Sequence, residues 1–190
     1  MTLPAVSVLD PNRQARLDRI RFFSMILARG CVLLAGLLTA ALLLYWFGAP
    51  SASIAKDAQI PEGWLTDIGP GRRALAFGIS FVPLGCLILA LLAARRCFNA
   101  FAAGTFFSRE PARGLRDFAL GLLASALLKP FSMAAMSVLL TLDAPAGQHR
   151  LTLSFGSDTV LMLLAAGTIA VIAWVMTEAA ALAEENQQFV

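Results

Sequence analysis

A lysine inside an apolar stretch is the residue of this sequence best placed to do chemistry. Lys129 lies near the middle of residues 118–142 and is followed at once by Pro130. A cation at the centre of a bilayer costs about 2.5–3.5 kcal/mol on insertion scales, so it needs compensation. Pro130 leaves the carbonyl four residues earlier without its helical donor, and Ser125 and Ser132 add polar groups nearby. These residues predict a helix kink beside a polar pocket.

Two readings of Lys129 stay open. In the functional reading, its ammonium faces a water-filled cavity, where it binds an anionic group or gates a conformational change. In the structural reading, the kink lets the side chain reach the membrane surface, or the ammonium bridges the freed carbonyl groups. The apolar stretches contain no Asp or Glu, and Asp143 and Asp158 lie at their ends. The sequence therefore offers Lys129 no obvious acidic partner.

The other reactive residue types form no recognisable catalytic or metal-binding pattern. The sole histidine, His149, lies beside Arg150, which excludes a multi-histidine metal site or an HExxH protease. Cys31, Cys86 and Cys97 are far apart and are typical of packing residues rather than of a CxxC pair or a disulfide framework. We therefore expect no catalytic, metal-binding or cofactor-binding residues, and no enzyme activity.

The elements that must position these residues are transmembrane helices. The sequence is 58% hydrophobic and only 14% charged, whereas soluble domains are about 45–50% apolar and about 25% charged. A helix needs about 20 apolar residues to cross the hydrocarbon core. Four stretches meet this length, at residues 26–47, 74–94, 118–142 and 159–177. Continuous apolar runs favour helices over the alternating strands of a barrel.

The predicted fold is an all-α integral membrane four-helix bundle. Residues 26–177 form the transmembrane domain, between a basic N-terminal segment of residues 1–25 and an acidic helical tail of residues 178–190. The pair Asp10-Pro11 predicts that a basic helix begins there and continues into the first span. Small residues four apart allow helices to approach closely, but in so Ala-rich a chain they select no particular interface.

The basic residues indicate which side of the membrane each connector occupies. Five arginines lie before or at the start of the first span, and five more lie between the second and third spans. The other two connectors hold four basic residues between them. Loops that stay in the cytoplasm carry an excess of Lys and Arg. We therefore expect a protein of the bacterial inner membrane with both termini in the cytoplasm.

The outer connectors are expected to be short and irregular. Residues 48–73 carry three prolines and several glycines, with Trp64 as an interfacial anchor. Residues 151–155 alternate in polarity, which is typical of a short strand. This strand can pair with part of the first outer loop, although two strands alone are marginally stable.

Two cytoplasmic segments form a candidate contact surface. Residues 95–117 mix phenylalanines with arginines, which predicts a turn at Gly104, a helix start after Ser108 and an amphipathic element in the membrane interface. The last helix is expected to continue beyond Thr177 through good helix formers into the acidic tail. A solvated surface without a partner is the alternative for both segments. The charged residues of the candidate contact surface are Arg95, Arg96, Arg109, Arg113, Arg116, Glu184 and Glu185.

Two parts of the sequence resemble a known family. One is FAAGTFFS at residues 101–108, before an Arg-rich helix start. The other is LSFGSD at residues 153–158, followed by the fourth span and by AEEN at residues 183–186. Over residues 20–190 the chain resembles the bacterial membrane proteins grouped as domain of unknown function 2975. The resemblance implies four transmembrane helices and brings no catalytic residues. Some members are similar to proteins encoded beside a small helix-turn-helix regulator, which implies a sensory or regulatory pairing.

The leading hypothesis is a non-enzymatic membrane protein that presents its cytoplasmic surfaces to a helix-turn-helix regulator or to another membrane subunit. The alternative is a small transporter or channel component whose route is lined by Lys129 and the Pro130 kink. A membrane enzyme is disfavoured, because the spans lack convergent polar groups. The expected partners are the lipid bilayer and one protein, without direct binding to nucleic acid. The sequence leaves the ligand, the trigger and homo-oligomerisation open.

Overall fold

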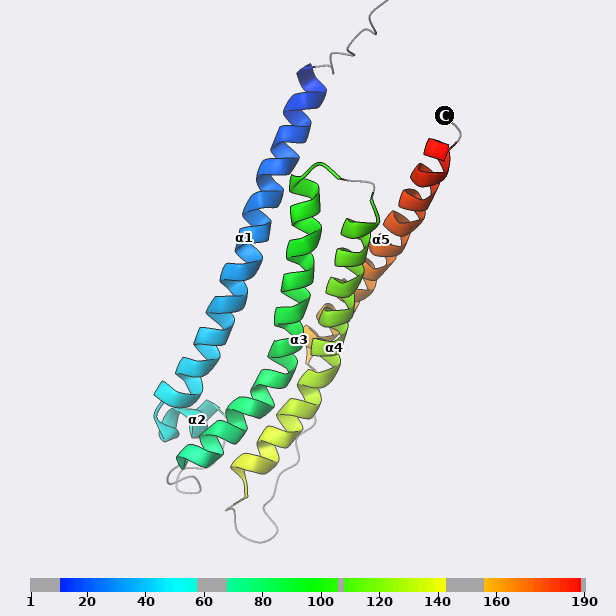
Figure 1. Ribbon diagram of the computed structural model, residues 1–190. Coiled ribbons are helices and arrows are strands. Elements are labelled where there is room, and N and C mark those ends of the chain that lie inside the picture. Colours follow the sequence, from blue (N-terminus) through cyan, green and yellow to red (C-terminus); the bar gives the residue numbers. More distant parts are fainter. Residues whose placement is uncertain (1–10, 58–67, 106–107, 143–155, 189–190) are drawn as a thin grey trace, which may run out of the picture.

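The described part of the chain forms one short and four long helices. The computed structural model describes residues 11–57, 68–105, 108–142 and 156–188. These residues form α1 (Pro11–Gly48), α2 (Ser51–Asp57), α3 (Pro70–Ala102), α4 (Arg109–Leu140) and α5 (Ser157–Gln188) (Figure 1). The four long helices are each long and apolar enough to cross a membrane. The predicted all-α four-helix bundle is confirmed.

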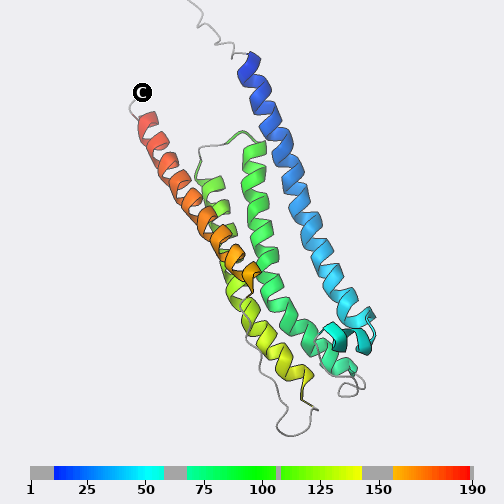
Figure 2. The same ribbon diagram turned by 180° about the vertical axis from the view of Figure 1, so that it is seen from behind.

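The long helices pack in the order in which they occur along the chain. α1 packs against α3, α3 against α4, and α4 against α5. Within the described residues α1 and α5 do not pack against each other, so they form the two edges of the bundle (Figures 1 and 2). The first turns of α1, the α3–α4 turn and the last turns of α5 lie at one end, which we call the termini end. The opposite end, which carries α2, is the α2 end.

The helices extend beyond the predicted spans. α1 begins at Pro11, as the sequence predicts, and its 38 residues extend for about 57 Å, well beyond a hydrocarbon core of about 30 Å. α5 continues without a break to Gln188, which confirms the predicted extension past the fourth span. α3 begins at Pro70, four residues before the predicted span, because proline is well accommodated in the first turn of a helix.

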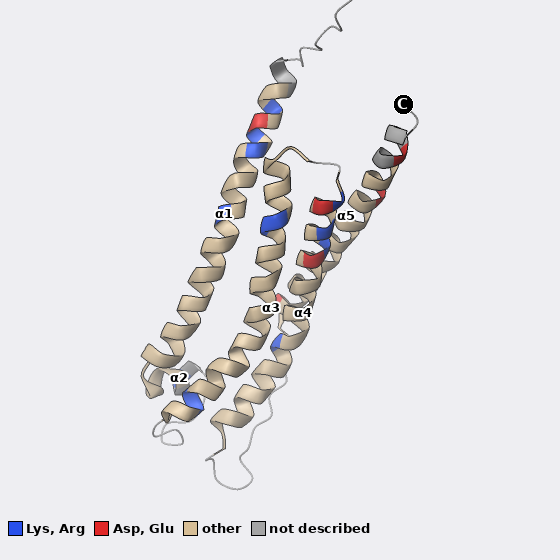
Figure 3. Ribbon diagram, viewed as in Figure 1, with Lys and Arg blue, Asp and Glu red and all other residues tan. Residues whose placement is uncertain are grey.

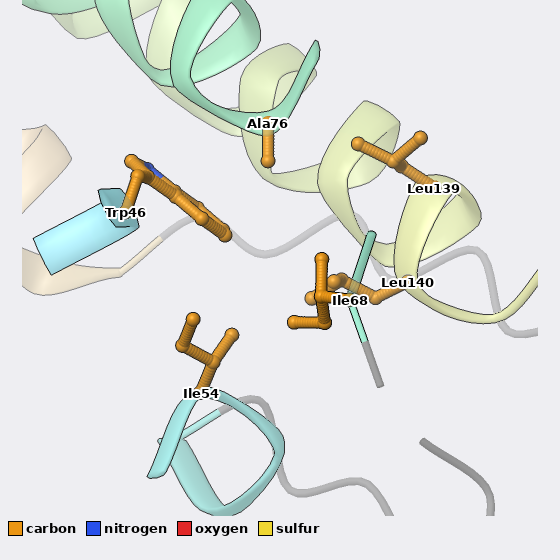
Figure 4. Close-up of a cluster of buried hydrophobic side chains, with 6 residues drawn as sticks. All are labelled: Trp46, Ile54, Ile68, Ala76, Leu139 and Leu140. Atoms are coloured by element: carbon orange, nitrogen blue, oxygen red, sulfur yellow. The ribbon is translucent and has the colours of Figure 1, made fainter. Parts of the chain in front are cut away.

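The connector between α1 and α3 is less irregular than predicted, because it contains α2. The backbone N–H groups of Ser53 and Ile54 donate to the carbonyl of Pro50, which starts the helix. Ile54 then becomes one of the most deeply buried side chains of the protein. It packs in a cluster at the α2 end with residues of α1, α3 and α4 (Figure 4), and the full cluster is Trp46, Ile54, Ile68, Ala76, Leu139 and Leu140. Burial of Ile54 therefore stabilises a helix where glycines and prolines predict a loop.

The helix contacts are made by small residues at heptad spacing. The buried face of α5 consists of Thr159, Ala166, Ala173 and Ala180, each seven residues after the last. A strict repeat of seven matches the left-handed crossing of closely packed helices. In α1, Ser24, Ala28, Cys31 and Ala35 are buried at steps of four and three residues, and the larger Trp46 is buried near the end of the helix.

The turn between α3 and α4 forms at Gly104, as predicted. Gly104 adopts a positive φ of 84°, a conformation that glycine takes without strain. Its N–H donates to the carbonyl of Phe101, and the N–H of Thr105 donates to that of Ala100, which is a Schellman motif. α4 then begins at Arg109 with Ser108 as N-cap. The helix start after Ser108 is confirmed.

The predicted amphipathic element in this connector is wrong. Residues 95–102 are the last turns of α3, and residues 109–117 are the first turns of α4. Arginine and alanine are good helix formers, so both transmembrane helices simply continue through the polar segment. The predicted strand of residues 151–155 and the anchor Trp64 lie outside the described residues.

Candidate functional site

Lys129 has an acidic partner that the sequence does not reveal. Its ammonium donates to the carboxylate of Asp158, in the first turn of α5. This contact forms because α5 begins beside the middle of α4 rather than beside its end (Figures 1 and 2). Asp158 also lies where the positive end of the α5 dipole favours a carboxylate. The ion pair therefore compensates the cation inside the third span.

A second polar contact joins α3 to α4 at two prolines. Pro83 lies inside α3 and has no N–H to donate to the carbonyl of Ile79, four residues earlier. The hydroxyl of Ser132, on α4, donates to that carbonyl at 2.8 Å. Pro130, inside α4, is fully buried. Ser132 thus satisfies the backbone group that Pro83 leaves free, as polar side chains do where proline interrupts a transmembrane helix.

The four residues predicted to form one polar pocket face different neighbours. Lys129 pairs with α5, Ser132 bonds to α3, and Ser125 and Pro130 are buried among the helices. Their contacts are those of a structural role: one ion pair, one interhelical hydrogen bond and close packing. That these residues surround a ligand stays a prediction.

Removing Ser132 tests the hydrogen bond to the kinked helix. We expect Ser132→Ala to lower the free energy of unfolding by about 0.6–1.7 kcal/mol, the range of interhelical hydrogen bonds in membranes. In a Pro83→Ala background the same change should have almost no effect, because residue 83 then supplies its own N–H to Ile79. Unfolding in mixed micelles measures both values. Thr168→Ala is the control, because Thr168 bonds only to the carbonyl of Leu164 on its own helix.

Replacing Asp158 alone should lower the stability of the fold more than replacing both Lys129 and Asp158. We expect Asp158→Asn to lower the free energy of unfolding, because an unpaired cation then remains in the span. The double variant Lys129→Met with Asp158→Asn should recover most of this loss. Additive losses in the double variant, measured by the same unfolding titration, would contradict a direct pair. If Lys129 lines a transport route, Lys129→Ala should instead change flux in proteoliposomes.

An arginine network at the α2 end was not predicted. Arg73, on α3, reaches the end of α1, where its guanidinium donates to the carbonyls of Trp46 and Ala49, both at 2.8 Å. It also donates to the carbonyl of Ile68 at 3.1 Å and to the hydroxyl of Ser51 at 3.1 Å. The last carbonyls of a helix have no intrahelical donor. Arg73 therefore caps α1 and holds it to α2 and α3.

The termini end gathers the arginines of the predicted contact surface. Arg95 and Arg96 lie near the end of α3, and Arg109, Arg113 and Arg116 lie in the first turns of α4 (Figure 3). All five side chains are exposed. Arg116 pairs with the neighbouring Asp117 at 3.2 Å, whereas Arg95, Arg96 and Arg113 form no ion pair with any described residue. The predicted surface is therefore present as a set of arginines on two adjacent helices.

The acidic residues of the tail lie on a different helix from these arginines. Glu184 and Glu185 lie in the last turns of α5, which diverges from α3 at the termini end (Figures 1 and 3). Glu185 is exposed and forms no ion pair within the described residues. At the termini end the arginines of the predicted surface therefore lie on α3 and α4, and Glu184 and Glu185 lie on α5.

A groove opens between α1 and α3 at the termini end. It has a volume of about 510 Å³ and is lined by Arg29, Arg95 and Asn99 together with apolar residues of α1. Arg21 lies at least one helical turn before the groove. Its guanidinium lies against the α3–α4 turn, because a Cβ added at Gly104 would be 2.8 Å from the Arg21 Nη2 atom. Of the two arginines that line the groove, only Arg95 belongs to the predicted contact surface. Arg29 was not predicted to bind anything, because its position at the start of the first span does not indicate a binding role.

Four apolar helices in one packed row define a multi-pass membrane protein. The model of a family described as protein of unknown function (DUF2975) matches residues 53–190. The chain belongs to this family. Searches of curated proteins and of solved structures find no match.

Proposed function

We propose that this protein is a non-enzymatic component of a bacterial inner membrane that binds a cytoplasmic regulatory protein through its termini end. The observation that carries the proposal is the set of exposed arginines on the ends of α3 and α4, of which Arg96 and Arg113 form no ion pair with any described residue. Arginine is enriched where proteins contact one another, and its planar guanidinium binds carboxylates in pairs of hydrogen bonds. The partner should therefore present an acidic surface.

The distribution of charge supports a cytoplasmic termini end. Arginines crowd the ends of α1, α3 and α4 there, whereas Lys56, Arg72 and Arg73 are the described basic residues near the α2 end (Figure 3). Of these three, Arg73 bonds to backbone carbonyls and so has a structural use. An excess of basic residues marks the cytoplasmic side of a membrane protein. Both termini then lie on that side.

The partner class follows from the family resemblance, which implies a pairing with a small helix-turn-helix regulator. A membrane subunit is the second partner class, and it would use the exposed apolar faces of the edge helices rather than the arginines. Transport has less support, because Lys129 is already paired with Asp158. No step of chemistry is assigned to any residue.

Charge-removing variants test the proposal. The full chain is purified in mild detergent, and its binding to a purified small helix-turn-helix regulator from its native host is measured. We expect binding by the wild type, and at least tenfold weaker binding by Arg96→Gln with Arg113→Gln. Lys56→Gln, at the α2 end, is the matched control and should bind as the wild type does. Reporter fusions to each variant show whether the orientation is retained.

Two results would overturn the proposal. One is recovery of the protein alone from its native host, together with unchanged transcription after deletion of its gene. The other is equal loss of binding in the Lys56→Gln control, because the arginines would then act only through net charge. Binding that depends on apolar substitutions in α1 or α5, and not on the arginines, would point to the membrane subunit instead.

A further inference from the structure

The groove between α1 and α3 has the composition of a site for a charged group attached to a hydrophobic chain. One wall carries Met25, Arg29 and Leu33, which are spaced by four residues and so form one stripe along α1. The other wall carries Arg95 and Asn99, one turn apart on α3. Ala28 is nearly buried at the contact between the two helices. Polar groups of two helices therefore face a shared space.

The groove attracts anions. Two of its lining residues are arginines, and none is acidic. Neither Arg29 nor Arg95 forms an ion pair with a described residue, so both guanidinium groups keep their full hydrogen-bonding capacity. Arginine forks match the oxygens of a phosphate group and bind them in pairs. Asn99 adds an amide donor beside them.

The position of the groove favours the phosphate of a lipid over a free phosphate ion. Leu33 and Val32 are both exposed, and they belong to the apolar part of α1 that must face acyl chains. Arg29 directly precedes the uncharged residues 30–47 of α1, and Arg95 directly follows the uncharged residues 74–94 of α3, so both arginines lie where the charge-free runs end. Arginines at such positions extend their guanidinium groups to the membrane surface. This is the depth of the lipid headgroups. A volume of about 510 Å³ lies within the usual range of small-molecule sites, about 300–1,000 Å³.

We propose that this groove binds the phosphate headgroup of an anionic phospholipid from the leaflet at the termini end. Arg29 and Arg95 hold the phosphate from two helices, Asn99 donates to a further headgroup oxygen, and an acyl chain lies along Val32 and Leu33. Basic pockets between transmembrane helices commonly bind such headgroups. Because the lipid bridges α1 and α3, its binding should also strengthen the contact between them.

A lipid titration of the purified full chain tests this site. Phosphatidylglycerol is added to the protein in neutral detergent, and both the melting temperature and the lipids retained in native mass spectrometry are followed. We expect saturable stabilisation by phosphatidylglycerol and little by phosphatidylcholine. Arg29→Gln and Arg95→Gln should each weaken the binding by at least about tenfold. Arg96→Gln is the matched control, because Arg96 is exposed on the same turn but does not line the groove.

The arms of the experiment separate the sources of phosphate. Equal stabilisation by inorganic phosphate would show a site for a free anion and would overturn the lipid proposal. Equal loss in Arg96→Gln would show only diffuse attraction of charge, and would overturn it as well. If a glutamine variant does not fold, Arg95→Lys and Asn99→Ala replace it, and each should bind more weakly than wild type. The titration contains no protein partner, so its outcome is independent of the proposed regulator binding.

Discussion

Replacing Gly121 with leucine is expected to leave little folded protein. Gly121, on α4, lies directly against the backbone of Ala90 on α3, and a Cβ at this position would be 2.7 Å from the Ala90 Cβ and 3.0 Å from its Cα. Backbone atoms cannot rotate away, so α3 and α4 must separate. Overpacking costs about 1–3 kcal/mol and occasionally more, and we expect a loss at or above the upper value. Thermal unfolding in detergent, followed by fluorescence size-exclusion chromatography, measures it.

Gly78→Leu is the matched control for this experiment. Gly78 also lies within a long helix, but a Cβ there would meet no atom within 4 Å. The control should keep the wild-type melting temperature or raise it slightly, because glycine is a poor helix former. Gly121→Ala should fall between the two. Equal melting of Gly121→Leu and Gly78→Leu would contradict the close approach of α3 and α4.

Replacing Arg73 with alanine is expected to cause the second largest loss. The change removes four hydrogen bonds from a charged donor and leaves the carbonyls of Trp46 and Ala49 without it. Hydrogen bonds to charged groups contribute about 1.5–3 kcal/mol each, but headgroups and water replace part of them. We therefore expect a loss of about 3 kcal/mol in total. Hydrogen exchange should rise at the end of α1 and in α2.

Lys and Ala variants separate charge from geometry at this site. Arg73→Lys keeps the charge but lacks the planar fork, so it should recover less than half of the loss. Lys56→Ala removes a basic residue from the same end, where Lys56 is exposed in α2, and should leave stability unchanged. A wild-type melting temperature for Arg73→Ala would show that α1 ends without help from α3.

The four long helices were predictable because each contains a long apolar run, interrupted by a charge only at Lys129 of α4, that only lipid can cover. The start at Pro11, the turn at Gly104 and the extension of α5 also have local signals, in a proline, a glycine and an unbroken run of helix formers. α2 was missed because its stability comes from burial of Ile54 against residues of three other helices. The helix preferences of neighbouring residues do not reveal such a contact. The supposed amphipathic element failed for a related reason, since mixed composition does not show where a helix ends.

The polar contacts were harder to predict than the helices. Pro83 predicts a carbonyl without a helical donor at Ile79, but no local pattern shows that Ser132 of another helix will bond to it. The pairing of Lys129 depends on where α5 begins relative to α4, which sequence length leaves unspecified. In the sequence, Arg73 was counted only among the basic residues that indicate the orientation in the membrane. In the structure, it bonds to carbonyls that are distant in sequence. The seven-residue repeat on α5 was not predicted either, because that helix contains many other alanines.

The row of helices has a consequence for biosynthesis. Each long helix packs only against its neighbours in the order of synthesis, and within the described residues α1 does not pack against α5. As the helices enter the lipid one by one during translation, each new helix can pack at once against the helix made just before it. No span has to wait exposed for a distant partner, and the growing chain can assemble by successive additions at one edge.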